Sequence, residues 1–158
     1  MPKAQKEARA MELLDLVGLN GFENKRPSEL SGEMRQRASL CRAIVHKPDV
    51  LIMDEPFGAL DAFTREDLWQ TMHDLRAKEP FTCVLITHDL RESVYLGDQV
   101  FVLSGRPART QYLLDVKWPD TGPGRRKLEG LYTPEVAAML ATLREQIQIA
   151  QGRDPMVH

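Results

Sequence analysis

Two short polar clusters each follow an apolar run, and their residue types suit chemistry on phosphates. Asp54 and Glu55 come directly after the run VLIM, and His88 comes directly after the run TCVLIT. One carboxylate can hold Mg²⁺ through its water shell, because Mg²⁺ prefers oxygen ligands and keeps several waters. A second carboxylate can orient or deprotonate a water, and an imidazole can hydrogen-bond a phosphate oxygen. The pattern favours phosphoryl transfer, and capping of the following helices is the alternative for acidic pairs at such positions.

A Ser-Gly turn that opens a helix is a third candidate. Ser31 and Gly32 precede the helical segment EMRQRASLCRAIVH. The N-terminus of a helix presents N–H groups and the positive end of the helix dipole, so it attracts anions. The Ser31 hydroxyl adds a hydrogen-bonding group, and Gly32 allows close approach to the backbone. Simple N-capping by Ser31 is the alternative interpretation.

The elements that would position these clusters alternate between helix and strand. Apolar periodicity predicts helices at about 5–19, 31–46, 64–78 and 89–96 and a last helix opening at 133–135, with strands at 50–53, 82–87, 100–103 and 111–116. This alternation is typical of a parallel α/β sheet, in which ligands bind at the carboxyl ends of the strands. The runs VLIM and TCVLIT show little alternation between apolar and polar residues, which predicts strands buried on both faces of the sheet.

Finer expectations concern the helices. In the first helix, Met11, Leu14 and Val17 recur at helical spacing, and Gly18 is a plausible stop. Thr64 and Asp67 fit a capping box for the third. In the third helix we expect Leu68, Met72 and Leu75 to face inward. We expect Trp69 to lie on the exposed or subdomain side.

Composition narrows the class of protein. The chain has 158 residues and a formal net charge of −2, which excludes a globally basic nucleic-acid binder. No apolar run approaches the roughly 20 residues of a spanning helix. Cys41 and Cys83 are too few for a disulfide framework, lie in apolar stripes and are expected to be core thiols.

Taken together, the motifs are more specific than each one alone. The ordered series LSGEMRQR, VLIMDEPFGALD and ITHD resembles the ATP-binding subunits of ABC transporters. The first resembles the family's signature loop, the second its Walker B strand and D-loop, and the third its switch histidine. An unrelated α/β nucleotide hydrolase would leave LSGEMRQR unexplained. The variant motifs look most like the nitrate, sulfonate and taurine importer branch.

The resemblance implies catalytic roles for three residues, with ATP and Mg²⁺ as the nucleotide and the metal. Asp54 would hold the water shell of Mg²⁺, and Glu55 would polarise the hydrolytic water. His88 would contact the γ-phosphate and couple its loss to a change of conformation.

The resemblance also implies a composite site between two ATP-binding subunits. Ser31 and Gly32 would contact the γ-phosphate of ATP bound mainly by the partner, and Asp61 would cross the dimer interface. Glu33 stands where the family usually has glycine. Pointing inward, its carboxylate would repel the γ-phosphate; pointing outward, as we expect, it would favour the helix N-terminus. The other implied partners are a membrane permease and, indirectly, a periplasmic or extracellular solute-binding protein, with the chain peripheral on the cytoplasmic face of the membrane and no nucleic acid bound.

Two motifs of the family, the Walker A loop and the Q-loop, have no counterpart in the sequence. No lysine is followed by Ser or Thr, so no GxxxxGK[ST] loop is present to cradle phosphates. The expected fold is therefore α/β: an incomplete P-loop NTPase (RecA-like) parallel sheet with the C-terminal part of the ABC helical subdomain. The expected parts are 1–47 (helical subdomain with the signature loop), 48–116 (core from Walker B onward) and 117–158 (loop and helix).

This absence leaves two interpretations of function. The first is an importer ATPase subunit that is truncated and inactive alone. The alternative is a non-catalytic degenerate or split-gene fragment that docks on a full ATPase subunit. In either case we expect the strands near His88 and at 100–103 to lack the neighbour that the Walker A strand provides in the family.

Overall fold

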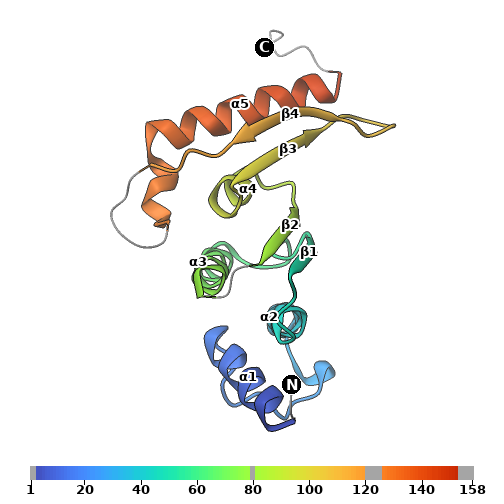
Figure 1. Cartoon of the computed structure of the whole chain (residues 1–158), viewed down its shortest axis with the longest axis vertical. Coiled ribbons are helices and arrows are strands. Elements are labelled where there is room, and N and C mark those ends of the chain that lie inside the picture. Colours follow the sequence, from blue (N-terminus) through green and yellow to red (C-terminus); the bar gives the residue numbers. More distant parts are fainter. Residues whose placement is uncertain (1–2, 79–80, 120–125, 153–158) are drawn as a thin grey trace. The chain divides into compact units, whose positions relative to one another are not determined.

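The computed structural model describes residues 3–78, 81–119 and 126–152, which fall into two compact units. The first unit runs from Met1 to Ile86 and the second from Thr87 to His158. Figure 1 shows the elements of each. Among the described residues, no helix is long and apolar enough to cross a membrane.

The first unit combines three helices with two parallel strands. Its elements are α1 (Lys3–Leu16), the 3₁₀ helix η1 (Pro27–Glu29), α2 (Gly32–Ile44), β1 (Val50–Asp54), α3 (Ala62–Lys78) and β2 (Thr82–Ile86). β1 and β2 pair in parallel from Val50 opposite Thr82 to Asp54 opposite Ile86. The predicted mixed α/β class with a parallel strand pair is confirmed.

Local signals explain where the first two helices begin and end. α1 is followed by Gly18 with φ of 70°, a left-handed conformation that glycine adopts without strain. Ser31 caps α2, because its hydroxyl accepts a hydrogen bond from the Met34 amide at 3.2 Å. Of the apolar residues at helical spacing, Val17 is buried and Met11 is 49% exposed, while Leu13 is fully buried. Leu13 and Val17 are four positions apart and share one helical face.

The third helix differs from expectation at its cap and at its tryptophan. Asp61 is the cap of α3, since its Oδ1 accepts hydrogen bonds from the amides of Phe63 (3.0 Å) and Thr64 (3.1 Å). The capping box predicted from Thr64 and Asp67 is wrong, because the helix starts earlier, at Ala62. The expected inward set, Leu68, Met72 and Leu75, is buried as predicted. Trp69, expected on the exposed or subdomain side, is also buried, so it is not exposed.

The parallel strands are buried on one face only. Leu51 and Met53 are buried, whereas Val50 and Ile52 are 55% and 68% exposed. The prediction of strands buried on both faces is wrong for this chain. Within the described ranges β1 and β2 form a sheet of two strands, so no further strand extends it.

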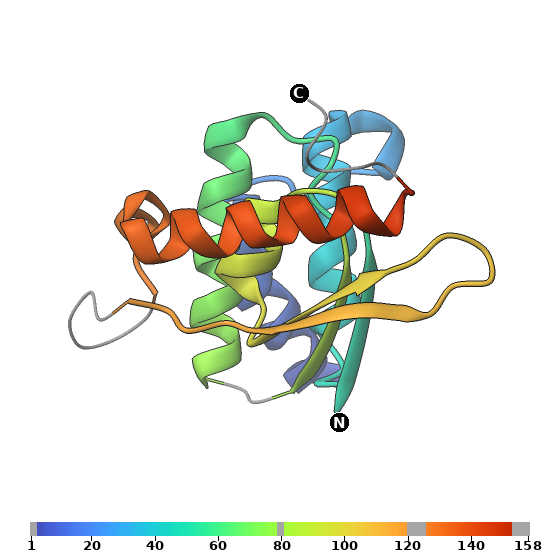
Figure 2. The same ribbon diagram turned by 90° about the horizontal axis from the view of Figure 1, so that it is seen from above.

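The second unit is an antiparallel hairpin with helices. It contains α4 (Leu90–Leu96), β3 (Gln99–Leu103), β4 (Thr110–Asp115), the 3₁₀ helix η2 (Leu128–Tyr132) and α5 (Pro134–Ala150). α5 runs along the β3–β4 hairpin, as Figures 1 and 2 both show. Val136 and Leu143 of α5 are fully buried. β3 pairs with β4 and with no other strand of the described chain.

Arg126 joins two segments within the second unit. One guanidinium nitrogen, Nη1, donates hydrogen bonds to the carbonyls of Val94, Tyr95 and Gly97, at 3.2, 3.0 and 2.7 Å. The guanidinium also lies over the Trp118 ring, 5.4 Å from its centroid. These contacts tie the segment after β4 to the end of α4, where helix carbonyls have no partner within the helix.

Candidate functional site

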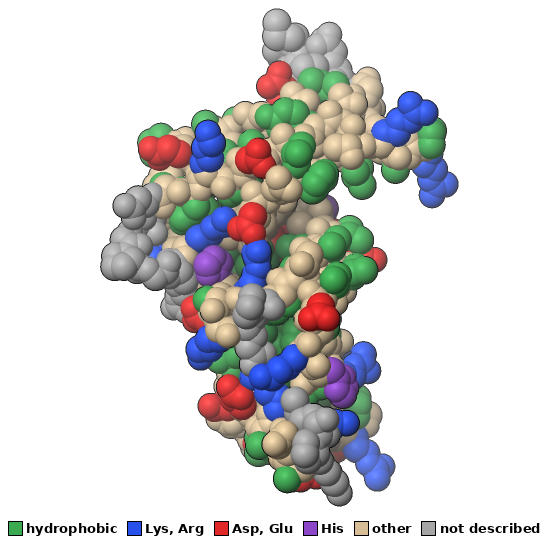
Figure 3. Space-filling model, in the orientation of Figure 1, with side chains coloured by type: hydrophobic (Ala, Val, Ile, Leu, Met, Phe, Trp, Pro, Cys, Tyr) green, Lys and Arg blue, Asp and Glu red, His purple; other side chains and the backbone are tan. Residues whose placement is uncertain are grey.

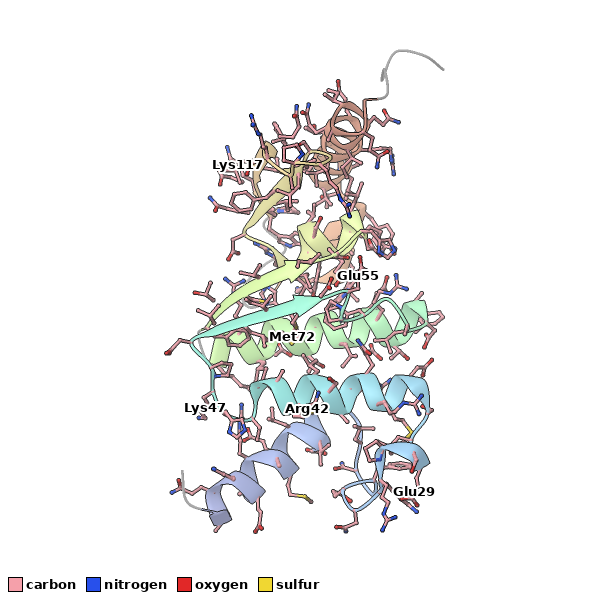
Figure 4. The ribbon with its side chains drawn as sticks, turned by 90° about the vertical axis from the view of Figure 1, so that its right-hand side faces the viewer. Glu29, Arg42, Lys47, Glu55, Met72 and Lys117 are labelled. Carbon is pink, nitrogen blue, oxygen red and sulfur yellow. The ribbon has the colours of Figure 1, made fainter. Side chains whose placement is uncertain are left out.

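Asp54 and Glu55 lie at the carboxyl edge of the parallel strand pair. Asp54 is the last residue of β1 and stands opposite Ile86, the last residue of β2. The Glu55 amide donates a hydrogen bond to the Ile86 carbonyl at 2.9 Å, which continues the pairing one step beyond the strands. Figure 4 shows Glu55 where the β1 arrow ends. Both residues are exposed, so their carboxylates are accessible to water and to a ligand.

The backbone of Glu55 is in an uncommon conformation. Its φ is 47°, in the left-handed region that disfavours residues with a Cβ. The chain then turns, with the Gly58 amide donating to the Glu55 carbonyl at 3.3 Å, and buries Phe57 beneath the turn. Such conformations cluster at functional sites, where they aim a side chain that the surrounding structure holds in place.

The turn before α2 combines an exposed serine and glycine with a nearby cation. Ser31 and Gly32 are exposed, and a Cβ built on Gly32 would meet only Arg35 Nη2, at 3.9 Å. Arg35 Nη1 donates to the Leu30 carbonyl at 2.6 Å, which holds the guanidinium beside the turn. The structure shows Ser31 as the N-cap, and its hydroxyl can still donate to an anion. Glu33 lies in the first turn of α2, half-buried.

Asp61 is committed to the start of α3. The Thr64 side-chain and amide hydrogen bonds, with that of the Phe63 amide, hold the pKa of the exposed Asp61 carboxyl below its ordinary value. The group is therefore ionised at neutral pH, and its negative charge lies at the positive end of the α3 dipole.

His88 follows β2 by two positions and belongs to the second unit. The residues on either side of it are firmly bonded. Thr87 Oγ1 donates to Glu92 Oε2 at 2.7 Å and accepts from the Asp89 amide at 3.0 Å. Asp89 caps α4 by accepting from the amides of Arg91 (2.9 Å) and Glu92 (3.3 Å). His88 itself is exposed.

Glu92 forms part of the hydrogen-bond network around His88, and the sequence pattern does not single it out for this role. The spacing of Asp89 and Glu92 predicts the start of a helix, and α4 does start there. The Glu92 carboxylate, however, is only 3% exposed and bonds Thr87, five residues earlier. The useful signal would have been an acidic residue on the inward face of a short helix, since buried carboxylates are nearly always hydrogen-bonded.

The donor set around Asp54 is compatible with Mg²⁺. The carboxylates of Asp54 and Glu55 supply the oxygen ligands that this ion prefers. In the part of the chain that the structure describes, no three His, Cys, Asp or Glu residues come together as a metal cage. One or both of these carboxylates would hold a Mg²⁺ ion here, and the ion would supply positive charge beside the phosphates of a nucleotide.

Comparison with known proteins decides the family. Residues 3–58 match the profile of the family described as ABC transporter. The chain is 40% identical over 150 residues to the taurine import ATP-binding protein TauB of Rhizobium johnstonii, covering 92% of this chain and 55% of that protein. The chain belongs to the ABC transporter ATPase family.

Further relatives agree with this assignment. Identity to the aliphatic sulfonates import ATP-binding protein SsuB 1 of Rhodococcus jostii is 53% over 96 residues, 61% of this chain and 39% of that protein. The fold resembles the ATP-binding cassette MJ0796, solved as a dimer in a post-hydrolysis state bound to ADP and Pi. The TM-score is 0.64 at 28% identity, over 74% of this chain and 50% of that one. This chain thus spans about half the length of the relatives that it matches, for example 55% of TauB.

Both the predicted family and the predicted cassette fold are therefore confirmed. The match over residues 3–58 includes the predicted signature loop and the Asp54–Glu55 pair. The relatives named for taurine and sulfonates agree with the branch that the sequence motifs favour.

Proposed function

We propose that this chain provides part of the ATP-hydrolysing machinery of an importer for taurine, other sulfonates or nitrate. One observation carries the proposal: two exposed carboxylates, Asp54 and Glu55, at the carboxyl edge of a parallel strand pair. Ligands of open α/β sheets bind at this edge. The names of the similar import proteins supply the class of solute.

The catalytic work divides among three residues. Asp54 holds Mg²⁺ through water, and the ion would neutralise charge on the nucleotide phosphates. Glu55 orients the attacking water and accepts its proton, a role that its exposed carboxylate permits. His88 donates a hydrogen bond to a γ-phosphate oxygen, where charge collects in the transition state.

The turn before α2 acts on a nucleotide held by a second ATP-binding subunit. Ser31 donates from its hydroxyl and Gly32 from its backbone, at a helix N-terminus flanked by the Arg35 guanidinium. Glu33 supports the N-terminus of α2, and Asp61 faces the partner subunit from the start of α3. A P-loop would cradle the phosphates, and these 158 residues contain no GxxxxGK[ST] motif.

The proposed setting is the cytoplasmic face of the membrane. There the chain contacts a permease and is linked through it to an extracytoplasmic solute-binding protein. Residues 1–47 correspond to the helical subdomain, 48–116 to the catalytic core, and 117–158 to a C-terminal loop and helix.

Reconstitution tests this proposal. The chain is co-purified with its permease and the partner ATP-binding subunit and placed in proteoliposomes with ATP inside and the solute-binding protein outside. We expect ATP-dependent uptake of labelled taurine, a short alkanesulfonate or nitrate. Substituting Ser31→Arg should abolish uptake by filling the phosphate-facing turn. ATP hydrolysis with no uptake of any of the three anions would contradict the proposed solute class.

A docking chain without catalysis remains the second candidate, and an observation favours it. Val50 and Ile52 leave one face of the β1–β2 sheet apolar and exposed, as expected of a chain that associates with another polypeptide. The two candidates differ in their dependence on Glu55. If the chain is catalytic, Ser31→Arg and Glu55→Gln both stop hydrolysis; if it only docks, Glu55→Gln leaves the rate unchanged.

A further inference from the structure

A side chain of α2 reaches the turn that carries Glu55. Gln36 donates from its side-chain amide to the carbonyl of Pro56, twenty residues along the chain. Both residues are half-buried. Because a hydrogen bond shielded from water competes less with solvent, this one holds the turn more firmly than an exposed one would.

Glu55 lies between two anchors. On one side its amide donates to the Ile86 carbonyl at 2.9 Å. On the other side the next carbonyl, that of Pro56, is held by Gln36. Between them the Glu55 backbone has φ of 47°. A left-handed conformation at a residue with a Cβ persists only where the surroundings over-determine it, and these two bonds provide that restraint.

The helix that supplies Gln36 is itself fixed. Arg37 Nη1 donates to the Val17 carbonyl at 2.9 Å, and its Nη2 donates to Thr64 Oγ1 at 3.3 Å. Arg37 therefore joins α2 to the end of α1 and to the first turn of α3. Because α2 is held at several points, the Gln36 side chain has little freedom to move with the Glu55 turn. The hydrogen bond from Gln36 therefore restrains the position of the turn.

We infer that Gln36 is a positioning residue for Glu55: it fixes the turn that aims the carboxylate and joins this turn to the helix that begins after Ser31. The inference rests on the proposed role of Glu55 in ATP hydrolysis. Gln36 acts through its hydrogen bond to the Pro56 carbonyl. Pro56 narrows the ways in which the turn can relax, because its ring fixes its own φ.

Amide hydrogen exchange on the full chain, followed by NMR, tests the contact. The variants are Gln36→Glu, which keeps the shape and loses the donor, and Gln36→Met, which loses all hydrogen bonding. Gln70→Glu, at another half-buried glutamine of the same unit, is the matched control. The reporter is the Glu55 amide, and the reference is the Thr82 amide, which donates to Asp49 at the opposite end of the strand pair.

The expected result is selective. Both Gln36 variants should speed exchange at Glu55 by about fivefold, the effect of losing one hydrogen bond, while Thr82 exchange and the control stay at the wild-type rate. Equal acceleration at Glu55 and Thr82 would overturn the inference, because Gln36 would then stabilise the whole unit. Unchanged exchange at Glu55 in both variants would overturn it as well.

A kinetic measurement distinguishes a role of Gln36 in positioning Glu55 from a role only in stabilising the fold. In the reconstituted importer, Gln36→Glu should lower kcat for ATP about tenfold and leave KM unchanged, because misaiming Glu55 affects the chemical step and not nucleotide binding. An unchanged kcat beside faster Glu55 exchange would overturn the positioning role. If the wild-type complex does not hydrolyse ATP, the proposed function fails, while the exchange result still decides whether Gln36 holds the turn.

Discussion

At the scale of single residues, side-chain chemistry and backbone conformation meet at Glu55. Its place after an apolar run, beside Asp54, can be read from the sequence. Its φ of 47° cannot, because no local pattern of glycine or asparagine marks the position. Two hydrogen bonds flank this conformation: the Glu55 amide donates to the Ile86 carbonyl, and the Gln36 side chain donates to the Pro56 carbonyl. Both partners, Ile86 and Gln36, are brought to the turn only by the folded unit.

Substitutions at Glu55 should reveal the strain of this conformation. We expect Glu55→Val to be less stable than Glu55→Asn by about 1–2 kcal/mol, because asparagine tolerates left-handed backbone and a β-branched residue does not. Both variants lose the carboxylate, so the comparison isolates the backbone. Urea unfolding measures the difference, and equal midpoints for the two variants would show that the turn is relaxed.

The sequence predicts residue types at the site better than their contacts. Ser31 and Asp89 act as caps as expected, since capping depends on a few neighbouring residues. The Thr87–Glu92 bond and the Gln36–Pro56 bond depend on how helices pack against strand ends. Apolar periodicity carries no information about such polar contacts.

At the scale of elements, helix starts show both the strength and the limit of local signals. The segment around the start of α3 contains Asp61, Thr64 and Asp67, and two capping patterns fit it. In the structure Asp61 caps α3, so the helix starts earlier than a Thr64 cap would allow. The hydrogen bonds of this cap lower the pKa of the Asp61 carboxyl. Trp69 is buried beside the predicted inward residues of α3, so this helix buries a wider stripe than periodicity alone indicates.

Acid unfolding should register the Asp61 cap. The folded-state pKa of Asp61 lies below the ordinary value of 3.8, so its stabilising effect is complete above that pH and is lost as the pH falls through the folded-state pKa. Asp61→Asn keeps a capping oxygen and removes the titration. We expect this variant to lose less stability than the wild type on acidification below about pH 4, measured by urea unfolding. Asp67→Asn, on the same helix, is the control; an acid response of Asp61→Asn equal to that of the wild type would contradict the account.

Within the second unit, close packing of η2 on Trp118 gives a steric prediction. A Cβ at Gly130 would lie 2.5 Å from Trp118 Cζ2, whereas a Cβ at Gly105 meets nothing within 4 Å. We expect Gly130→Ala to lower the free energy of unfolding by about 1–3 kcal/mol, the usual effect of overpacking, and Gly105→Ala to leave it unchanged. Thermal unfolding of the two variants checks this, and similar melting temperatures would show that Trp118 moves aside freely.

At the scale of the whole molecule, the exposed faces of the strands are the main departure from an ordinary parallel sheet. Figure 3 shows hydrophobic side chains gathered over β1 and β2. They include Ile52 and Val84, 68% and 46% exposed and paired across the two strands. The sequence predicted buried strands because its apolar runs are those of a covered sheet, and the described residues cover only one face.

This face should promote association. We expect the double substitution Ile52→Thr and Val84→Thr to reduce self-association in sedimentation velocity, with the free energy of unfolding changed by no more than about 0.5 kcal/mol, as for other exposed positions. Phe63→Thr, at a residue 83% exposed on α3, is the control outside this face. Association that is unchanged by the double substitution would show that the strands' outer face is not the contact surface.

The account depends most on the catalytic role of Glu55, and ATP turnover by the assembled importer tests that role most directly. The rate of phosphate release and the amount of bound nucleotide are measured on the same preparation, for the wild type and for Glu55→Gln. We expect turnover to fall at least about 100-fold, the usual effect of losing a general base, while bound ATP is retained. Turnover at the wild-type rate with Glu55→Gln would contradict the central claim.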